Sequence, residues 1–282
     1  MGQFRDRMVK APMLIDTHAH LDFPEYAQDL SGVIERANAA GVSRIISIST
    51  SLEGSLRAIE LAERFEGVHA TVGIHPCYVD ESPDIILPQL RELAKHPQVV
   101  GIGETGIDYH RSQNPPEAPE ALTLWTQNRE KQARFFDQQL TLAVELGLNV
   151  VVHQRDSWED TLRILRPYSG KLRAVYHCFG GTLAQAHQLL DLGFLVSFTG
   201  IVTFKNAHGA HESAAKLPAG SFFLETDCPF LAPVPHRGQR CEPAYTLLIA
   251  EHIARLRGET LEQVAEHTSL AAHAFFQRRA PL

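Results

Sequence analysis

Residues 13–23 read MLIDTHAHLDF, in which an apolar run leads into two histidines, His18 and His20, flanked by Asp16 and Asp22. Residues i and i+2 of a strand point to the same face, so both imidazoles are predicted to face one point. Two nitrogen donors aimed at one point suit a transition-metal ion. A polar surface loop would look similar over so short a stretch, so the rest of the chain must decide between a metal site and a loop.

The composition is that of a globular protein. Of the 282 residues, 44% are hydrophobic and 21% are charged, which is enough apolar material for a sizeable core. Apolar runs of about 18 residues, which would cross a membrane, do not occur in the sequence. Residues 1–12 lack the apolar segment of a secretory signal and are predicted to be a short disordered extension. The four cysteines form no C-x-x-C pair, so we expect a reducing, cytoplasmic compartment.

The net charge of −7 restricts the classes of partner. It argues against a protein that coats nucleic acid with a broad basic face. It leaves open a protein that binds a few phosphates locally, especially where bound cations supply the positive charge. No membrane association and no obligate protein partner are indicated.

Eight short apolar runs, rich in β-branched residues, alternate with amphipathic stretches, which is typical of parallel strands buried on both faces. The predicted strands are 13–15, 44–49, 68–73, 98–103, 148–152, 172–176, 193–198 and 221–225. The predicted helices are 29–40, 52–66, 84–95, 124–146, 156–166, 182–191, 206–216, 243–257 and 259–278. This alternation predicts an α/β fold, a single (β/α)₈ TIM barrel over residues 13–278.

Two points of the fold prediction stay open. A doubly wound open sheet is the competing architecture, and the missing glycine-rich turn after the first strand disfavours it. Residues 111–121, RSQNPPEAPEA, form a long connection with three prolines after the fourth strand. Such a loop is either a functional lid or a solvated filler.

Chemically active side chains follow most of the predicted strands, at the end where a (β/α)₈ barrel carries its active site. They are His18, His20, His75, Glu104, His153, His177 and Asp227. The four imidazoles and two carboxylates of this set other than His75 are too many for a single tetrahedral zinc ion. They suit two ions that share a bridging carboxylate and activate a water between them. Nitrogen and oxygen ligands admit Zn, Mn, Fe or Mg, so the ion stays open.

Further residues near the predicted strand ends are candidates for substrate binding. Arg155 lies two residues after His153 and either binds a phosphate or forms an ion pair at the barrel rim. The loop PVPHRGQR, 233–240, offers His236 and Arg237 for phosphate binding, with plain solvation as the alternative. His75 is predicted to contact substrate or the activated water rather than to fill the core.

An aromatic residue follows the sixth predicted strand. Phe179 stands beside His177, where it would either stack on a nucleobase or, as we favour, pack into the protein.

These motifs together resemble the TatD family of metal-dependent deoxyribonucleases, within the amidohydrolase superfamily. The resemblance covers about residues 13–278 and rests on IDTHAHLD, GIHP, GETGIDYH, VVVHQRD, YHCFGG, GFLVSFTGIVTFKNA, FLETDCPFLAPVPHRG and EPAY. Departures from the family pattern include Cys77, where a second histidine is usual, and Gly180, where a serine is common. The resemblance implies one ion held by His18, His20 and Asp227, a second held by His153 and His177, and Glu104 as the bridge.

The sequence therefore predicts a divalent-metal-dependent phosphodiesterase with Glu104 and Asp227 as catalytic residues and Asp227 as the general base. The resemblance further implies a 3′-5′ deoxyribonuclease that acts on single-stranded DNA, with RNA left open as a substrate. One alternative keeps the metal centre but acts on a small molecule, as an amidohydrolase, lactonase or deaminase. Another is a metal- or nucleic-acid-binding protein without catalytic activity.

Overall fold

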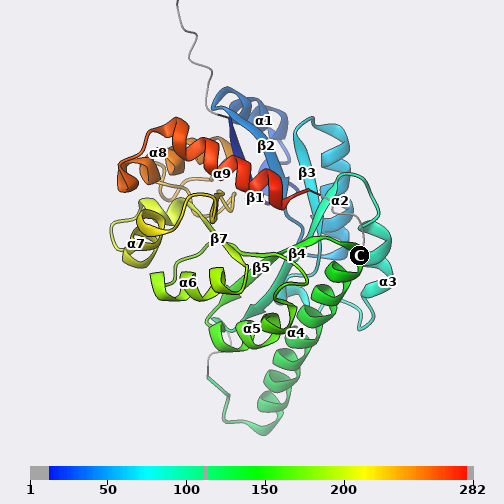
Figure 1. Ribbon diagram of the computed structural model, residues 1–282. Helices are drawn as coiled ribbons and strands as arrows, with labels where there is room; N and C mark the ends of the chain where they lie inside the picture. The colour runs from blue at the N-terminus through cyan, green and yellow to red at the C-terminus, as the bar shows by residue number, and fades with distance from the viewer. Residues whose placement is uncertain (1–12, 111–113, 278–282) are drawn as a thin grey trace, which may run out of the picture.

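The computed structural model describes residues 13–110 and 114–277, so the predicted extension 1–12 lies outside the described residues. In the described part of the chain, eight parallel strands pair in sequence order and helices surround them (Figure 1). The strands are β1 Leu14–Ala19, β2 Val42–Ser47, β3 Val68–Val72, β4 Val99–Asp108, β5 Asn149–Arg155, β6 Ala174–Tyr176, β7 Leu195–Phe198 and β8 Phe222–Leu224.

The first and last strands meet, which closes the barrel. Ala19 forms a parallel bridge with Cys228. The hydroxyl of Thr17 donates to the carbonyl of Leu224 at 3.0 Å. Sequential strand order and this closure confirm the single (β/α)₈ barrel and exclude the doubly wound sheet, in which the strand order reverses.

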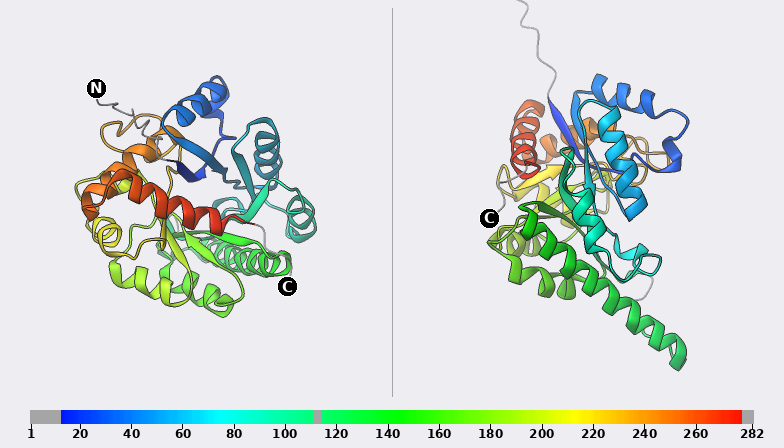
Figure 2. Two further views of the ribbon diagram at one scale, coloured as in Figure 1. Left: turned by 45° about the horizontal axis from the view of Figure 1, so that its top comes forward. Right: turned by 90° about the vertical axis from the view of Figure 1, so that its right-hand side faces the viewer.

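The predicted helices are confirmed to within a few residues, with one exception. They are α1 Leu30–Ala39, α2 Leu52–Arg64, α3 Leu87–Leu93, α4 Pro119–Leu146, α5 Trp158–Leu165, α6 Leu183–Asp191, α7 His208–Lys216, α8 Thr246–Arg257 and α9 Leu261–Phe275. The exception is α4, which begins at Pro119 rather than at residue 124. Proline suits the first turn of a helix, where its missing N–H would have no partner. The first turns of α4 extend beyond the body of the molecule (Figure 2, right).

A cluster of apolar side chains from the strands packs against the end of α9. This helix lies across one end of the barrel (Figure 2, left). The members of the cluster are Ile15, Ile46, Ile48, Val100, Val151, Val175, Leu195, Phe223, Ala272, Phe275 and Phe276. Most of the strand residues among them lie in the first half of their strands, so the opposite mouth, at the carboxyl ends, is where polar side chains gather. No helix in the described part of the chain is both long and apolar enough to cross a membrane.

Three strands run further than predicted. β1, β4 and β5 continue past His18, Glu104 and His153, which the sequence placed at or after the strand ends. Polar residues are poor indicators of a buried strand, but they are stable inside one when they find partners there. Because β5 continues to Arg155, two residues after His153, the two side chains face the same way.

Candidate metal centre

The two histidines of the opening motif converge as predicted. The Nε2 atoms of His18 and His20 lie 3.3 Å apart, and both side chains are buried. The Nδ1 atom of His20 lies 2.9 Å from the carbonyl oxygen of Ile48. A carbonyl accepts only, so Nδ1 carries the proton and Nε2 presents a lone pair to the centre.

Glycines flank Glu104 because the backbone has no room for side chains there. Gly103 and Gly106 have φ angles of 140° and 146°, which residues with a Cβ rarely adopt. A Cβ on Gly106 would clash with the carbonyl oxygen of His153. Close approach of β4 to β5 thus places the Glu104 side chain next to His153.

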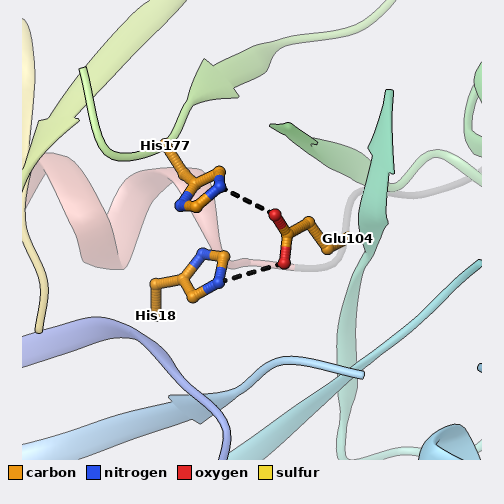
Figure 3. A group of neighbouring side chains, drawn as sticks. All are labelled: His18, Glu104 and His177. Atoms are coloured by element: carbon orange, nitrogen blue, oxygen red, sulfur yellow. Dashed lines mark ion pairs between the residues drawn. The ribbon is translucent and has the colours of Figure 1, made fainter. Parts of the chain in front are cut away.

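The carboxylate of Glu104 faces a first group of imidazoles, His18 and His20, and a second group, His153 and His177. Figure 3 shows one member of each group, His18 and His177. Its Oε2 atom is 3.3 Å from His18 Nε2 and 3.7 Å from His20 Nε2. Its Oε1 atom is 2.7 Å from both His153 Nδ1 and His177 Nε2. One carboxylate therefore serves both groups, one oxygen to each.

Asp227 completes the first group from the turn after β8. Its Oδ1 atom lies 3.6 Å from His18 Nε2 and 3.4 Å from His20 Nε2. The backbone of Asp227 is left-handed, with φ 56°, and its N–H donates to the carbonyl of His18 at 2.9 Å. Aspartate tolerates this conformation better than most residues. The turn holds the carboxylate over the end of β1.

Asp16 holds this turn in place rather than facing the centre. Its carboxylate accepts hydrogen bonds from the hydroxyl of Thr226 at 2.6 Å and from the backbone N–H of Thr226 at 3.0 Å. It also accepts from the backbone N–H of His18 at 3.2 Å. Burial raises the pKa of Asp16 to about 8. Asp16 therefore links the first strand to the residue that precedes Asp227.

His75 lies near the second group, but its Nδ1 atom is not available to bind a cation. That atom accepts a hydrogen bond from the backbone N–H of Cys77 at 3.0 Å. Nε2, which lies 3.6 Å from Glu104 Oε1, therefore carries the proton. Burial, with the nearby His153, lowers the pKa of His75 to about 3, so the ring is neutral near pH 7. His75 presents a neutral N–H donor to the centre.

Sequence reasoning missed Asp108, which orients His153. Its Oδ2 atom lies 3.1 Å from His153 Nε2. Asp108 stands four residues after Glu104 on β4, so the two point to the same face. Strand parity would have identified it had β4 been predicted at its full length.

Sequence reasoning also missed Glu225, which lies behind two of the imidazoles. It is 3.9 Å from His18 Nδ1 and 3.6 Å from His177 Nδ1, and both nitrogens are buried without a hydrogen-bond partner. Ser197 donates to Glu225 Oε2 at 2.8 Å, and the backbone N–H of Cys178 donates to Oε1. Glu225 stands two residues before Asp227, and that spacing was the available signal.

The protonation states of the centre favour a cation. Burial alone would raise the pKa of Glu104, but His177, His75 and His18 outweigh it and hold that pKa well below its usual value. Three overlapping groups bring ligand atoms within 4.8 Å of one another, namely His18 with His20 and Asp227, His18 with Glu104 and His177, and His75 with Glu104 and His153. Burial disfavours a charge on His177, but Glu104 outweighs burial and holds the pKa of His177 well above its usual value, so a divalent ion would take the place of a proton there. Imidazole nitrogens and carboxylate oxygens together make a donor set suited to divalent metal ions.

Removing the charge of Glu225 is expected to weaken metal binding. Glu225→Gln keeps a similar shape but no longer attracts the protons on His18 and His177, and loss of such an outer partner typically costs about 10–100-fold in metal affinity. Titration against a metal-binding dye measures the affinity. Glu92→Gln, at a side chain that is 74% exposed, is the matched control. Equal affinities of the two variants would show that Glu225 is only part of the packing.

The candidate phosphate-binding residues lie around the mouth of the barrel, outside the groups of imidazoles and carboxylates described above. Arg155 is exposed at the end of β5. His236 stacks on Tyr245 with ring centroids 4.4 Å apart, and the Arg237 guanidinium lies 4.2 Å from the centre of the Phe204 ring. The other cation of that loop, Arg240, is instead paired with Asp29 and Glu242.

Phe179 is only 6% exposed and belongs to the main hydrophobic core. Its burial confirms the favoured prediction that it packs into the protein.

Comparison with known proteins identifies the family of this chain. The sequence pattern of the family described as TatD related DNase matches residues 15–277. The metal-dependent hydrolase YabD of Bacillus subtilis is 37% identical over 266 residues, which cover 94% of this chain and 99% of YabD. The 3′-5′ ssDNA/RNA exonuclease TatD of Erwinia tasmaniensis is 34% identical over 270 residues, which cover 93% of this chain and 99% of that protein.

A solved structure gives the same result for the fold. YjjV, a TatD homologue from Escherichia coli, superimposes with a TM-score of 0.84 at 29% sequence identity, over 95% of this chain and 99% of YjjV. The family match, the sequence identity and the fold all point to the same family. The chain belongs to the TatD-related DNase family of metal-dependent hydrolases.

Proposed function

We propose that this protein is a divalent-metal-dependent phosphodiesterase that removes nucleotides from the 3′ end of single-stranded DNA, or of RNA. The observation that carries the proposal is Glu104, whose Oε2 atom faces His18 and His20 and whose Oε1 atom faces His153 and His177. The first ion would be held by His18, His20 and Asp227, and the second by His153 and His177, with Glu104 shared. The activity named for the Erwinia relative supports the class of substrate.

The residues of the centre have separate tasks in this reaction. When bound, the two ions lower the pKa of a water molecule and neutralise charge on the phosphodiester. Asp227, at the edge of the first group, takes the proton from the attacking water. The neutral His75 donates its Nε2–H to a phosphoryl oxygen, where negative charge develops. Asp108 and Glu225 hold the imidazoles in place.

The exposed cations at the barrel mouth bind the neighbouring phosphates in this proposal. Arg155 extends from the strand that carries His153 and is exposed. A guanidinium pairs well with the two oxygens of a phosphodiester. His236 and Arg237 stand in the loop that follows Asp227, each against an aromatic ring that limits its freedom.

Arg155→Ala is expected to raise the KM for a single-stranded oligonucleotide about tenfold, because a charge-assisted hydrogen bond is lost. Metal content should not change, since the side chain is exposed and lies outside the groups of ligand-type atoms. Steady-state kinetics and elemental analysis of the same sample test both statements. Arg163→Ala, at a side chain that is 67% exposed on α5, is the control. A collapse of metal content in Arg155→Ala would make Arg155 structural.

A metal screen tests the proposed function itself. Protein depleted of metal is supplied with Zn, Mn, Mg or Fe(II) and given oligonucleotides labelled at the 5′ end, in single- and double-stranded form. We expect a ladder of products shortened from the 3′ end, faster on single strands and abolished by a chelator. Turnover of a lactone or a dihydropyrimidine, with every oligonucleotide left intact, would favour the small-molecule alternative instead.

A further inference from the structure

A groove of about 620 Å³ opens beside the metal centre, on the β1–β3 side of the barrel mouth. Its aromatic lining consists of Phe23, Tyr78 and Phe230, and we call it the aromatic groove. Phe23 stacks on His20 with ring centroids 4.8 Å apart, and Tyr78 meets His75 edge to face at 6.3 Å. The groove is therefore continuous with the residues that surround Glu104.

Phe230 is the most accessible ring of the aromatic groove. It is 47% exposed, although it lies only three residues after Asp227. Its backbone N–H donates to the carbonyl of Asp227 at 3.0 Å, and its ring meets Phe23 edge to face at 5.9 Å. The ring is thus held at a fixed place next to the centre while part of it stays open to a ligand. Aromatic faces of this kind stack on nucleobases of any sequence.

The charge of the aromatic groove is negative. Four carboxylates line it, from Asp22, Glu25, Glu53 and Glu81, against one guanidinium, from Arg57. That guanidinium is already paired, at 3.1 Å with Asp22 and at 2.8 Å with Glu53. Such a lining repels a phosphate but accommodates an uncharged planar ring.

We propose that the aromatic groove binds the base of the 3′-terminal nucleoside of the substrate, stacked on Phe230. The rest of the strand then leads away from the groove towards Arg155 and Arg237, which are exposed and do not line it. This inference rests on the proposed function and adds the requirement that the end of the strand carry a base and a free hydroxyl. A terminal 3′-phosphate is disfavoured because it would approach the carboxylates of the groove.

A double-mutant cycle tests the proposal by removing the Phe230 ring, the terminal base of the substrate, or both. The parent and Phe230→Ala are each given two oligonucleotides that differ only in an intact or an abasic 3′-terminal nucleotide. We expect kcat/KM to fall about tenfold when either partner is removed, and no further when both are, because one stacking contact is lost in each case. Phe230→Tyr keeps the ring and should retain the parent's preference. An abasic 5′ end is the control substrate, and Leu270→Ala, 64% exposed on α9, is the control variant.

Binding gives a readout that does not depend on turnover. A hydrolysis-resistant phosphorothioate oligonucleotide with 2-aminopurine at its 3′ end should lose fluorescence on binding the parent and Phe230→Tyr, but much less on binding Phe230→Ala. Equal losses in kcat/KM on intact and abasic ends, or unchanged quenching in Phe230→Ala, would overturn the inference and leave the nuclease activity standing. A parent that cleaves neither oligonucleotide with any metal would overturn the proposed function and this inference together.

The effect of the negative charge of the aromatic groove is tested with substrates that differ in their 3′ end. An oligonucleotide ending in a 3′-phosphate should be cleaved several-fold more slowly than the same strand ending in a 3′-hydroxyl. Glu81→Gln removes one of the four carboxylates and should narrow that difference by increasing the rate on the phosphorylated end. Equal rates on the two ends in the parent would contradict the orientation proposed for the terminal nucleoside.

Discussion

Asp227→Asn is expected to lower the rate of oligonucleotide hydrolysis about 10²–10⁴-fold at saturating metal, the usual contribution of a general base. Asparagine keeps the shape and one coordinating oxygen, but it does not accept the proton of the attacking water. The left-handed turn and its hydrogen bond to His18 suit asparagine as well as aspartate, so the fold should be preserved. The rate and the metal content are measured on the same sample, because loss of a charge also weakens metal binding.

Asp84→Asn is the matched control for this variant, since Asp84 is 80% exposed and pairs with Lys131 on α4. We expect it to behave as the parent. An Asp227→Asn protein that is fully loaded with metal and nearly as fast as the parent would exclude Asp227 as the base. The proton acceptor would then have to be sought elsewhere in the centre.

Glu104→Gln is expected to reduce bound metal from the proposed two ions per chain towards one and to lower activity about 10³-fold. The amide offers one neutral oxygen, so it cannot replace a carboxylate that faces His18 through one oxygen and His177 through the other. The rate loss corresponds to the several kcal/mol of charge stabilisation that a metal ion supplies to a transition state. Elemental analysis after reconstitution with excess Mn or Zn gives the stoichiometry.

Two further observations make this measurement decisive. Glu104→Asp keeps the charge on a shorter side chain and should bind more metal than Glu104→Gln. Circular dichroism separates loss of metal from loss of fold, which matters because Glu104 is buried. A parent protein that saturates at one ion per chain would contradict the bridging role proposed for Glu104.

The architecture was predictable because the signals for it are local. Apolar strands and amphipathic helices differ in period, and their alternation over this length suits a barrel. The predicted strand ends were wrong where a polar residue of the centre interrupts the apolar run, as at Glu104, whose side chain lies inside a buried strand. The start of α4 at Pro119 was missed because a proline-rich stretch was interpreted as loop throughout.

Which residues form the centre was also predictable, because parallel strands bring their carboxyl ends to one mouth. His18, His153 and His177 came from the sequence as residues at those ends, and the structure brings them together around Glu104. Their roles as ligands stay predictions. Asp108 and Glu225 were not predicted because each contacts an imidazole of the centre from behind. In the sequence, such a residue is marked only by an even spacing from a residue of the centre, four after Glu104 and two before Asp227.

The sequence by itself determined the barrel, the family and most of the side chains at the mouth, since each depends on the order of residues along the chain. Only the tertiary structure decided what each side chain faces. Asp16 and Asp22 flank the same two histidines, yet Asp16 holds the turn before Asp227 and Asp22 pairs with Arg57. Arg237 and Arg240 share one loop, yet Arg240 is engaged by Asp29 and Glu242. Partners of this kind come from distant strands and loops, and their distances exist only once the barrel has closed.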